Sequence, residues 1–263
     1  MGRVQLFEFN DVAFAPDFLQ EAILDSLGEV LDRGRVIDAL FPHFATFVEE
    51  AKVGEILDLG AGSAQVARIL ARSLESAGRE GPRIVLTDLR PRPLAWAEAE
   101  ARSGGRIQSV RRSVDAAAIP PEVAAGRARM IINAIHHFPP ELVRRILADA
   151  VHAGAPIFIA EGFDRELRGF VPFIRLGTGL LLTNPLRARR GRVARALCTW
   201  ALPLIPLAAV WDGFVSTMRV HTLPELHAMA SEIAPHWRWE GGEFRFAAGG
   251  KGIWFWGMPS AGM

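Results

Sequence analysis

The chain has 263 residues; half of them are hydrophobic, 22% are charged, and the formal net charge is +1. This composition is typical of a globular protein, and the near-neutral charge gives no indication of a nucleic-acid partner. Cys198 is the only cysteine, which excludes an intrachain disulfide and a zinc site built from cysteines. Residues 1–14 lack the apolar core of a secretion signal, so we expect a cytoplasmic protein.

The first part of the chain, residues 1–50, is expected to form a helical cap, because apolar residues recur at helical spacing between positions 16 and 50. Residues 51–263 are expected to form one α/β domain, since short apolar segments then alternate with helical ones. Such alternation predicts a doubly wound, mostly parallel sheet with helices on both faces. Strands are expected at 54–59, 83–86, 106–110, 129–133 and 156–160, and helices at 65–74, 93–101 and 140–151.

Residues 164–211 interrupt this alternation and are expected to form a helical insertion, or lid, after the fifth strand. Its most apolar part, 193–211, contains Arg195, Pro203 and Pro206. These residues favour a buried or lid-forming helix pair over a membrane span. Contact with a membrane surface is a less favoured interpretation, suggested by the arginines at positions 187, 189, 190, 192 and 195.

The remainder of the chain is expected to complete the sheet. Residues 214–220 resemble a strand, preceded by a turn at Asp212-Gly213 and followed by His221. Thr222 and Glu225 have the spacing of a capping box that opens a helix to Ile233. Two aromatic strands, 237–246 and 252–256, are expected to pair in antiparallel fashion.

The strongest local motif is Asp58-Leu59-Gly60-Ala61-Gly62, an apolar strand that enters a glycine turn before a helix. Such a turn can hold either the pyrophosphate of a dinucleotide or the amino-acid part of S-adenosylmethionine. Two residues favour the second ligand. Gln65 is bulky where dinucleotide sites need a small residue, and Asp58 would repel a pyrophosphate but attract an ammonium group.

Acidic residues also follow the next two strands. Asp88 stands where an α/β nucleotide site places a carboxylate for the ribose hydroxyls, with an N-cap or turn aspartate as the alternative. Asp115 could accept a hydrogen bond from an adenine amino group, with Val114 beside the ring. A plain loop aspartate is the other interpretation of Asp115.

In order and spacing, these motifs resemble the class I S-adenosylmethionine-dependent methyltransferases over residues 55–161. Asp58-Leu59-Gly60-Ala61-Gly62, Thr87-Asp88, Val114-Asp115 and the segment from Ile132 to Phe138 carry the resemblance. Trp211-Asp212-Gly213, after the proline-rich apolar insertion, is similar to a segment in a group of bacterial methyltransferase-like proteins. The resemblance implies a seven-stranded sheet whose last strand is antiparallel.

The resemblance also implies site residues. Asp58 and Gly60 would contact the methionine part, Asp88 the ribose and Asp115 the adenine. Methyltransferases that act on amino groups often have Asn/Asp-Pro-Pro-aromatic after the fourth strand, whereas this chain has Asn133-Ala134-Ile135. This difference argues against methylation of nucleic-acid bases. The predicted cofactor-binding residues are Asp58, Gly60, Ala61, Gly62, Asp88, Leu89, Val114, Asp115 and Asn133.

Candidate proton acceptors follow the fourth and fifth strands: His136, His137 and Glu161. Histidine titrates near neutral pH and suits an oxygen acceptor. A structural role, in which His136-His137-Phe138 packs a loop, is the alternative. Because no further ligand stands at helical spacing from the two histidines, no metal site is predicted.

The sequence therefore predicts an enzyme that uses S-adenosylmethionine, releases S-adenosylhomocysteine and methylates a small, lipophilic acceptor on oxygen or carbon, as in natural-product biosynthesis. Two alternatives remain. One is a nicotinamide-dependent oxidoreductase, against which Gln65 and the absence of tyrosine argue. The other is a protein that binds S-adenosylmethionine without catalysis.

Overall fold

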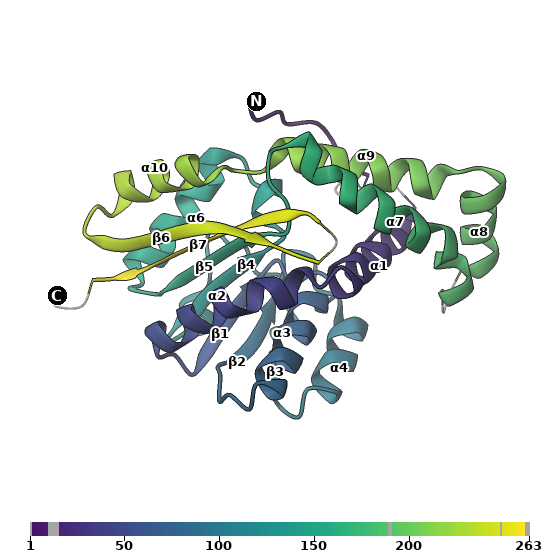
Figure 1. The fold of residues 1–263 in the computed structure, drawn as a ribbon. Coiled ribbons are helices and arrows are strands. Elements are labelled where there is room, and N and C mark those ends of the chain that lie inside the picture. Colours follow the sequence, from purple (N-terminus) through teal and green to yellow (C-terminus); the bar gives the residue numbers. More distant parts are fainter. Residues whose placement is uncertain (1, 10–15, 189–190, 248, 261–263) are drawn as a thin grey trace. The chain divides into compact units, whose positions relative to one another are not determined.

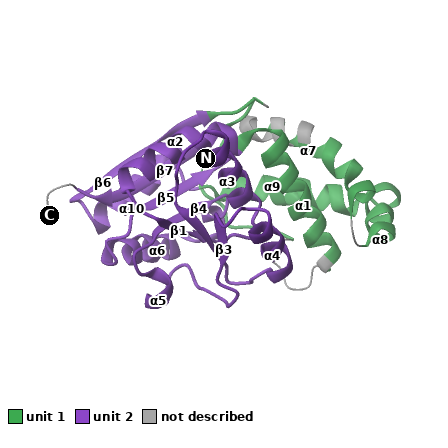
Figure 2. Cartoon of the chain, turned by 90° about the horizontal axis from the view of Figure 1, so that it is seen from below, with its two compact units in different colours: residues 1–36, 163–220, 245–251 green, residues 37–162, 221–244, 252–263 purple. Residues whose placement is uncertain are grey.

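The structure is a computed structural model, and it describes residues 2–9, 16–188, 191–247 and 249–260. The chain divides into two compact units (Figure 2). We call Met1–Val36, Phe163–Val220 and Arg245–Lys251 the helical unit. We call Ile37–Gly162, His221–Phe244 and Gly252–Met263 the sheet unit.

The sheet unit is built on one seven-stranded sheet with the order β3-β2-β1-β4-β5-β7-β6 (Figure 1). Strands β1 to β5 pair in parallel, and β7 runs antiparallel to β5. The predicted mostly parallel sheet with an antiparallel last strand is thereby confirmed. The strands are β1 (Glu55–Leu59), β2 (Arg83–Thr87), β3 (Ile107–Ser109), β4 (Ala128–Ile132), β5 (Ile157–Glu161), β6 (Trp237–Arg245) and β7 (Lys251–Pro259).

The helices of the sheet unit follow the predicted alternation. The capping box before α10 is present, with the Thr222 backbone N–H donating to Glu225 Oε2 at 2.8 Å. Two short helices, α5 and η1, were not predicted. The helices are α2 (Val36–Ala51), α3 (Gln65–Ser76), α4 (Pro93–Ala101), α5 (Pro121–Ala124), η1 (Ile135–His137), α6 (Pro140–His152) and α10 (Leu223–Ile233).

Helix α2 belongs to the sheet unit although it lies within the predicted cap, residues 1–50. Its buried Phe44 and Phe47 contact Phe158 of β5, with ring centroids 5.5 and 5.3 Å apart. The unit boundary therefore falls after Val36, because these aromatic rings join α2 to the core of the sheet.

The helical unit consists mainly of helices α1 (Asp17–Arg33), α7 (Leu167–Arg187), α8 (Arg192–Ala196), the π-helix η2 (Leu197–Ala201) and α9 (Leu204–Arg219). Ala22, Leu181 and Ile205 form the centre of its core. Residues 164–211 thus contain the helices expected there, of which α9 extends beyond position 211. The arginines at 189 and 190, which the sequence analysis considered for contact with a membrane surface, lie outside the described residues.

The strand and turn predicted around position 214 are wrong, because residues 212–219 belong to α9. Ile205, Ala208, Asp212 and Val215 are buried at helical spacing, so one face of the helix continues through the expected turn. Asp212 is held in that face, where its Oδ1 accepts a hydrogen bond from the Phe9 backbone N–H at 2.7 Å.

By length and composition, no single helix within the described residues qualifies as a membrane span. Arg192–Ala201 and Leu204–Arg219 pass such a test only as a pair, and they are bent by 78° relative to each other. The helix pair expected at 193–211 is therefore present. Burial of this pair is incomplete, since Val193, Leu197, Trp200, Leu204 and Leu207 are all more than half exposed.

Candidate functional site

Strand β1 ends in the glycine turn that opens α3. Gly60 has φ +84°, and a Cβ placed on it would lie 3.3 Å from the Ala134 Cβ, so the turn passes close to the chain after β4. The backbone N–H groups of Gly60 and Ala61 both donate to the Thr87 carbonyl at 3.0 Å, which joins the turn to the end of β2. Glycine at position 60 is therefore required by both backbone conformation and space.

The Asp58 carboxyl lies at this turn and is only 2% exposed. Its Oδ2 is buried and has no hydrogen-bond partner in the part of the chain that the structure describes. Burial, and to a lesser extent the charge of Asp88, raises the pKa of Asp58 to about 7. This carboxyl can therefore accept a donor from a ligand, and a cationic donor would stabilise its ionised form.

Asp88, directly after β2, is held by two backbone groups. Its Oδ2 accepts from the Gly62 N–H at 2.9 Å, and its Oδ1 accepts from the Arg90 N–H at 2.8 Å. A carboxylate oxygen accepts more than one hydrogen bond, so both oxygens keep capacity for hydroxyl donors. Leu89, the next residue, is 63% exposed.

Sequence reasoning missed Trp96, which supports the glycine turn from α4. The indole is fully buried, and its Nε1 donates to the Gly62 carbonyl at 2.9 Å. A lone tryptophan among alanines and glutamates signals a buried helix face. Its partner, 34 positions away, follows only from the way that α4 packs against the turn.

The two residues predicted after β3 differ in their surroundings. Val114 is buried, and its N–H donates to the Asp88 carbonyl at 3.0 Å, so it lies at the end of β2. Asp115 is exposed, and its Oδ1 accepts from the Ala117 N–H at 2.9 Å. That bond is the one expected of a loop aspartate, and it uses one of the two carboxylate oxygens.

Asn133, directly after β4, has φ +54°. Its Oδ1 accepts from the Gly162 N–H at 2.6 Å, which joins the ends of β4 and β5. The Nδ2 group is buried and has no partner among the described residues. The end of β4 thus carries a second buried polar group for which the described part of the chain supplies no hydrogen-bond partner.

His136 and Glu161 form a buried pair that joins η1 to the last residue of β5. The Nδ1 of His136 lies 2.9 Å and 3.0 Å from the two carboxylate oxygens of Glu161, and its backbone N–H donates to Oε1 at 3.0 Å. Two contacts to one carboxyl fix the orientation of the imidazole ring. A proton between Nδ1 and the carboxyl would complete this pair.

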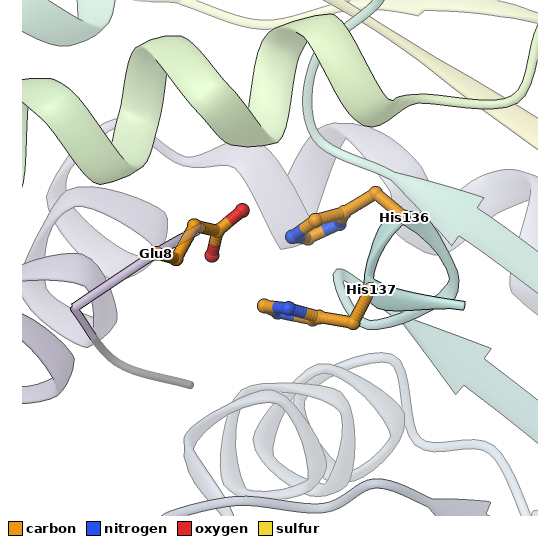
Figure 3. A group of neighbouring side chains, drawn as sticks. All are labelled: Glu8, His136 and His137. Carbon is orange, nitrogen blue, oxygen red and sulfur yellow. The ribbon is translucent and has the colours of Figure 1, made fainter. Parts of the chain in front are cut away.

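Two further histidines lie near this pair. The rings of His136 and His137 lie side by side on η1, and their centroids are 4.1 Å apart (Figure 3). His221, at the start of the second sheet-unit segment, contacts the Phe138 carbonyl through Nε2 at 2.9 Å. Burial raises the pKa of Glu161 to about 8, although its bond to the His136 N–H and the charges of His137 and His221 act in the opposite direction.

The ends of β1 and β4 lie where the order of the sheet reverses. Strands β1 and β4 are neighbours, while β2 and β5 continue the sheet in opposite directions. Open α/β sheets bind ligands outside the carboxyl ends of the strands at such a point. The turn after β1 and the chain after β4 lie there in contact, since Gly60 approaches Ala134.

Two solved structures share this architecture. A candidate O-methyltransferase from Nostoc punctiforme PCC 73102 is 14% identical, with a TM-score of 0.51, and the match covers 97% of this chain and 64% of that one. An O-methyltransferase family protein from Burkholderia thailandensis is 15% identical, with a TM-score of 0.50, over 95% of this chain and 62% of that one. The chain has the fold of the class I methyltransferases.

This methyltransferase-like chain spans less than two thirds of the length of both structures. At the level of sequence, no protein-family model matches it, and none of the curated proteins does. The likeness therefore extends to the fold alone.

Proposed function

We propose that the chain is an S-adenosylmethionine-dependent methyltransferase that acts on a small, lipophilic acceptor at oxygen or carbon. The observation that carries this proposal is the buried Oδ2 of Asp58, which lacks a hydrogen-bond partner among the described residues. Leaving such a group unbonded is costly, so the site favours a ligand that donates to it. The α-ammonium group of S-adenosylmethionine is such a donor, whereas a pyrophosphate would be repelled.

The neighbouring residues fit the rest of this cofactor. A Cβ on Gly62 would meet nothing within 4 Å, so the turn has open space beside it. Both oxygens of Asp88 can accept ribose hydroxyls. The unbonded Nδ2 of Asn133 is a donor for a ligand acceptor such as the cofactor carboxylate. We assign the methionine side to Ala61 and Gly62, and the adenine side to Leu89, Val114 and Asp115.

His136 is proposed as the general base and Glu161 as its positioning residue. Bound S-adenosylmethionine would supply a methyl group on a positively charged sulfur, open to in-line attack by an acceptor. The acceptor hydroxyl or acidic C–H must lose its proton, and Nε2 of His136 is the atom that takes it. Glu161 holds the ring through Nδ1 and stabilises the imidazolium that results.

The nature of the acceptor is proposed on two grounds. A histidine base suits oxygen and activated-carbon nucleophiles, which must be deprotonated to react. The apolar composition of residues 164–211 favours a lipophilic molecule. Apolar phenols, carboxylic acids and 1,3-dicarbonyl compounds are the acceptor classes to test first.

Calorimetric titration with S-adenosylmethionine, S-adenosylhomocysteine and NAD tests the cofactor assignment. We expect micromolar binding of the two sulfur compounds, its loss in Asp88→Ala, and no binding of NAD. Binding of NAD alone would favour an oxidoreductase, and binding of none of the three by folded protein would overturn the proposal.

Formation of S-adenosylhomocysteine in the presence of each acceptor class tests catalysis. Turnover that depends on the acceptor and is lost in His136→Gln, while cofactor binding is retained, would support the proposed enzyme. Cofactor binding without turnover across the panel would instead favour a non-catalytic binding protein.

A further inference from the structure

Charge is distributed unevenly along the helical unit. Every charged residue between Glu166 and Asp212 is an arginine. Arg187 and Arg195 form ion pairs with carboxylates of α1, namely Glu29, Glu21 and Asp25. Arg192 is exposed, and its guanidinium donates to the Leu186 carbonyl at 2.7 Å. Arg187 and Arg195 are thus paired with carboxylates of α1, and Arg192 presents an exposed positive charge at the start of α8.

Helices α8 and η2 have an exposed apolar stripe. Val193, Leu197 and Trp200 follow one another at intervals of four and three residues and are 74, 56 and 54% exposed. On the opposite side, Arg195 and Thr199 are buried. The spacing places the three exposed residues on one helix face, and that face is apolar although it is in contact with water.

Helix α9 continues this pattern after the bend. Leu204 and Leu207 are 52 and 63% exposed, while Ile205 and Ala208 are buried in the core of the unit. Leu202, within the bend, is 61% exposed. The helix is therefore apolar on two sides, and packing within the helical unit accounts for only one of them.

The indole N–H of Trp200 is already bonded within the unit, because Nε1 donates to the Leu182 carbonyl at 2.9 Å. The ring can therefore leave water without an unsatisfied donor. Leu182 and Leu186 on α7 are also exposed, at 44 and 61%. Exposed apolar side chains thus occur on three successive helices around the bend.

We propose that this surface docks the protein onto an anionic lipid membrane. We name it the apolar face, and it consists of Val193, Leu197, Trp200, Leu202, Leu204 and Leu207. Large exposed apolar surfaces mark interaction sites. Exposed apolar residues that adjoin the exposed Arg192 are complementary to an acyl-chain boundary with negative headgroups above it.

The geometry favours a protein that lies in the membrane surface. The two helical segments are bent by 78°, and the buried sides of both pack inside the helical unit. A span would have to expose Arg195 and Asp212 to hydrocarbon, although both are buried and hydrogen-bonded. The proposal is independent of the cofactor and base assignments, since those use residues of the sheet unit and the apolar face lies in the helical unit.

Flotation with vesicles tests the proposal. Purified full-length protein is mixed with phosphatidylcholine vesicles or with vesicles containing 30% phosphatidylglycerol, in low and high salt. We expect binding to the anionic vesicles, weaker binding to the neutral ones, and release by alkaline carbonate.

Leu204→Ser/Leu207→Ser is the central variant, since both side chains are exposed and neither is needed for the core. Its partition coefficient on anionic vesicles should fall by roughly tenfold or more. Arg192→Gln should reduce binding by roughly fivefold. Leu94→Ser, which alters a 74% exposed leucine on α4 in the sheet unit, is the matched control and should bind as the unaltered protein does.

Three results would overturn the proposal. The first is equal binding of the double variant and the unaltered protein. The second is retention on vesicles after carbonate, which would indicate an inserted segment. The third is the absence of vesicle binding together with a dimer that the double variant abolishes, since the apolar face would then be an interface between two copies of the chain.

Discussion

At the residue scale, the buried carboxyl groups of Asp58 and Glu161 differ in what holds them. Glu161 is bonded to both the backbone N–H and the ring of His136, whereas Asp58 keeps a buried oxygen without a partner in the described structure. Burial raises the pKa of both groups. We therefore assign Asp58 to ligand binding and Glu161 to holding a catalytic side chain.

The pKa of Asp58 leads to a prediction about cofactor affinity. Because this pKa is raised to about 7, the carboxyl is ionised above that value and loses its charge as the pH falls through it. S-adenosylmethionine should therefore bind at least about tenfold more weakly at pH 5.5 than at pH 7.5, as measured by calorimetry. Asp58→Asn should bind weakly at both values, and an affinity of the unaltered protein that is independent of pH would contradict the assignment.

The His136–Glu161 pair predicts an order of kinetic effects. His136→Gln should lower kcat by about 100-fold or more, because the proton acceptor is lost. Glu161→Gln should lower kcat by about tenfold and alter its pH profile, because the ring loses the carboxylate that holds it. His137→Gln should have the smallest effect. All three should retain cofactor affinity, and a larger loss in His137→Gln than in His136→Gln would reverse the roles.

At the scale of elements, the turn between β1 and α3 depends on specific residues and on contacts with two neighbouring segments of the sheet unit. Gly60 needs a positive φ and the close approach to Ala134, and Asp88 binds the N–H of Gly62. The turn is thereby fixed by its own backbone, by the end of β2 and by the chain after β4. Such a turn can receive a ligand without rearranging, which lowers the entropic cost of binding.

Two glycine substitutions separate the requirements of this turn from those of the adjacent chain. Gly60→Ala should lower the free energy of unfolding by about 1–3 kcal/mol, because an alanine is strained at φ +84° and its Cβ would lie 3.3 Å from the Ala134 Cβ. Gly54→Ala, before β1, is the control. Its Cβ would meet nothing within 4 Å, and its change should stay within about 0.5 kcal/mol in urea denaturation. Equal losses of unfolding free energy in the two variants would show that position 60 has no special requirement for glycine.

The capping box at the start of α10 allows a second test at this scale. Thr222→Ala removes the side chain that accepts from the first turn of the helix, and should cost about 1 kcal/mol of unfolding free energy. Thr222→Ser keeps the hydroxyl and should recover most of that loss. Urea denaturation of the three proteins measures both effects, and a serine variant as unstable as the alanine variant would contradict the capping role.

At the scale of the whole molecule, the two proposed activities belong to different units. The cofactor residues and the histidines lie in the sheet unit, and the apolar face lies in the helical unit. Each unit has a core of its own, with Trp96 and Phe158 in the first and Leu181 and Ile205 in the second. Ligands for the two activities should therefore protect different parts of the chain.

Hydrogen exchange can test this separation. S-adenosylmethionine at a hundredfold excess over its Kd stabilises the form that binds it by about 2.7 kcal/mol. We expect slower exchange in residues 59–64 and 87–90, and no change in 192–207. Anionic vesicles should slow exchange in 192–207 and leave 59–64 unchanged. Protection of 192–207 by the cofactor alone would contradict the assignment of these activities to separate units.

Most of the local structure follows from the amino-acid sequence alone. Strand and helix limits from β1 to α6 agree to within a few residues, because alternating apolar segments, glycines and prolines report the local backbone. It also placed Asp58, Asp88, His136 and Glu161 at strand ends. It was wrong at 214–220, where an apolar segment without a clear period was interpreted as a strand although it is the end of α9.

Which of these residues come into contact depends on how the elements pack in the fold. The contacts of Trp96 with Gly62, of His136 with Glu161 and of Gly60 with Ala134 depend on the order of the strands and on helix packing. Periodicity reports which face of an element is buried, but not which element covers it. For the same reason, the exposure of Leu204 and Leu207 was not foreseen: an apolar residue signals burial, and the fold determines whether anything covers it.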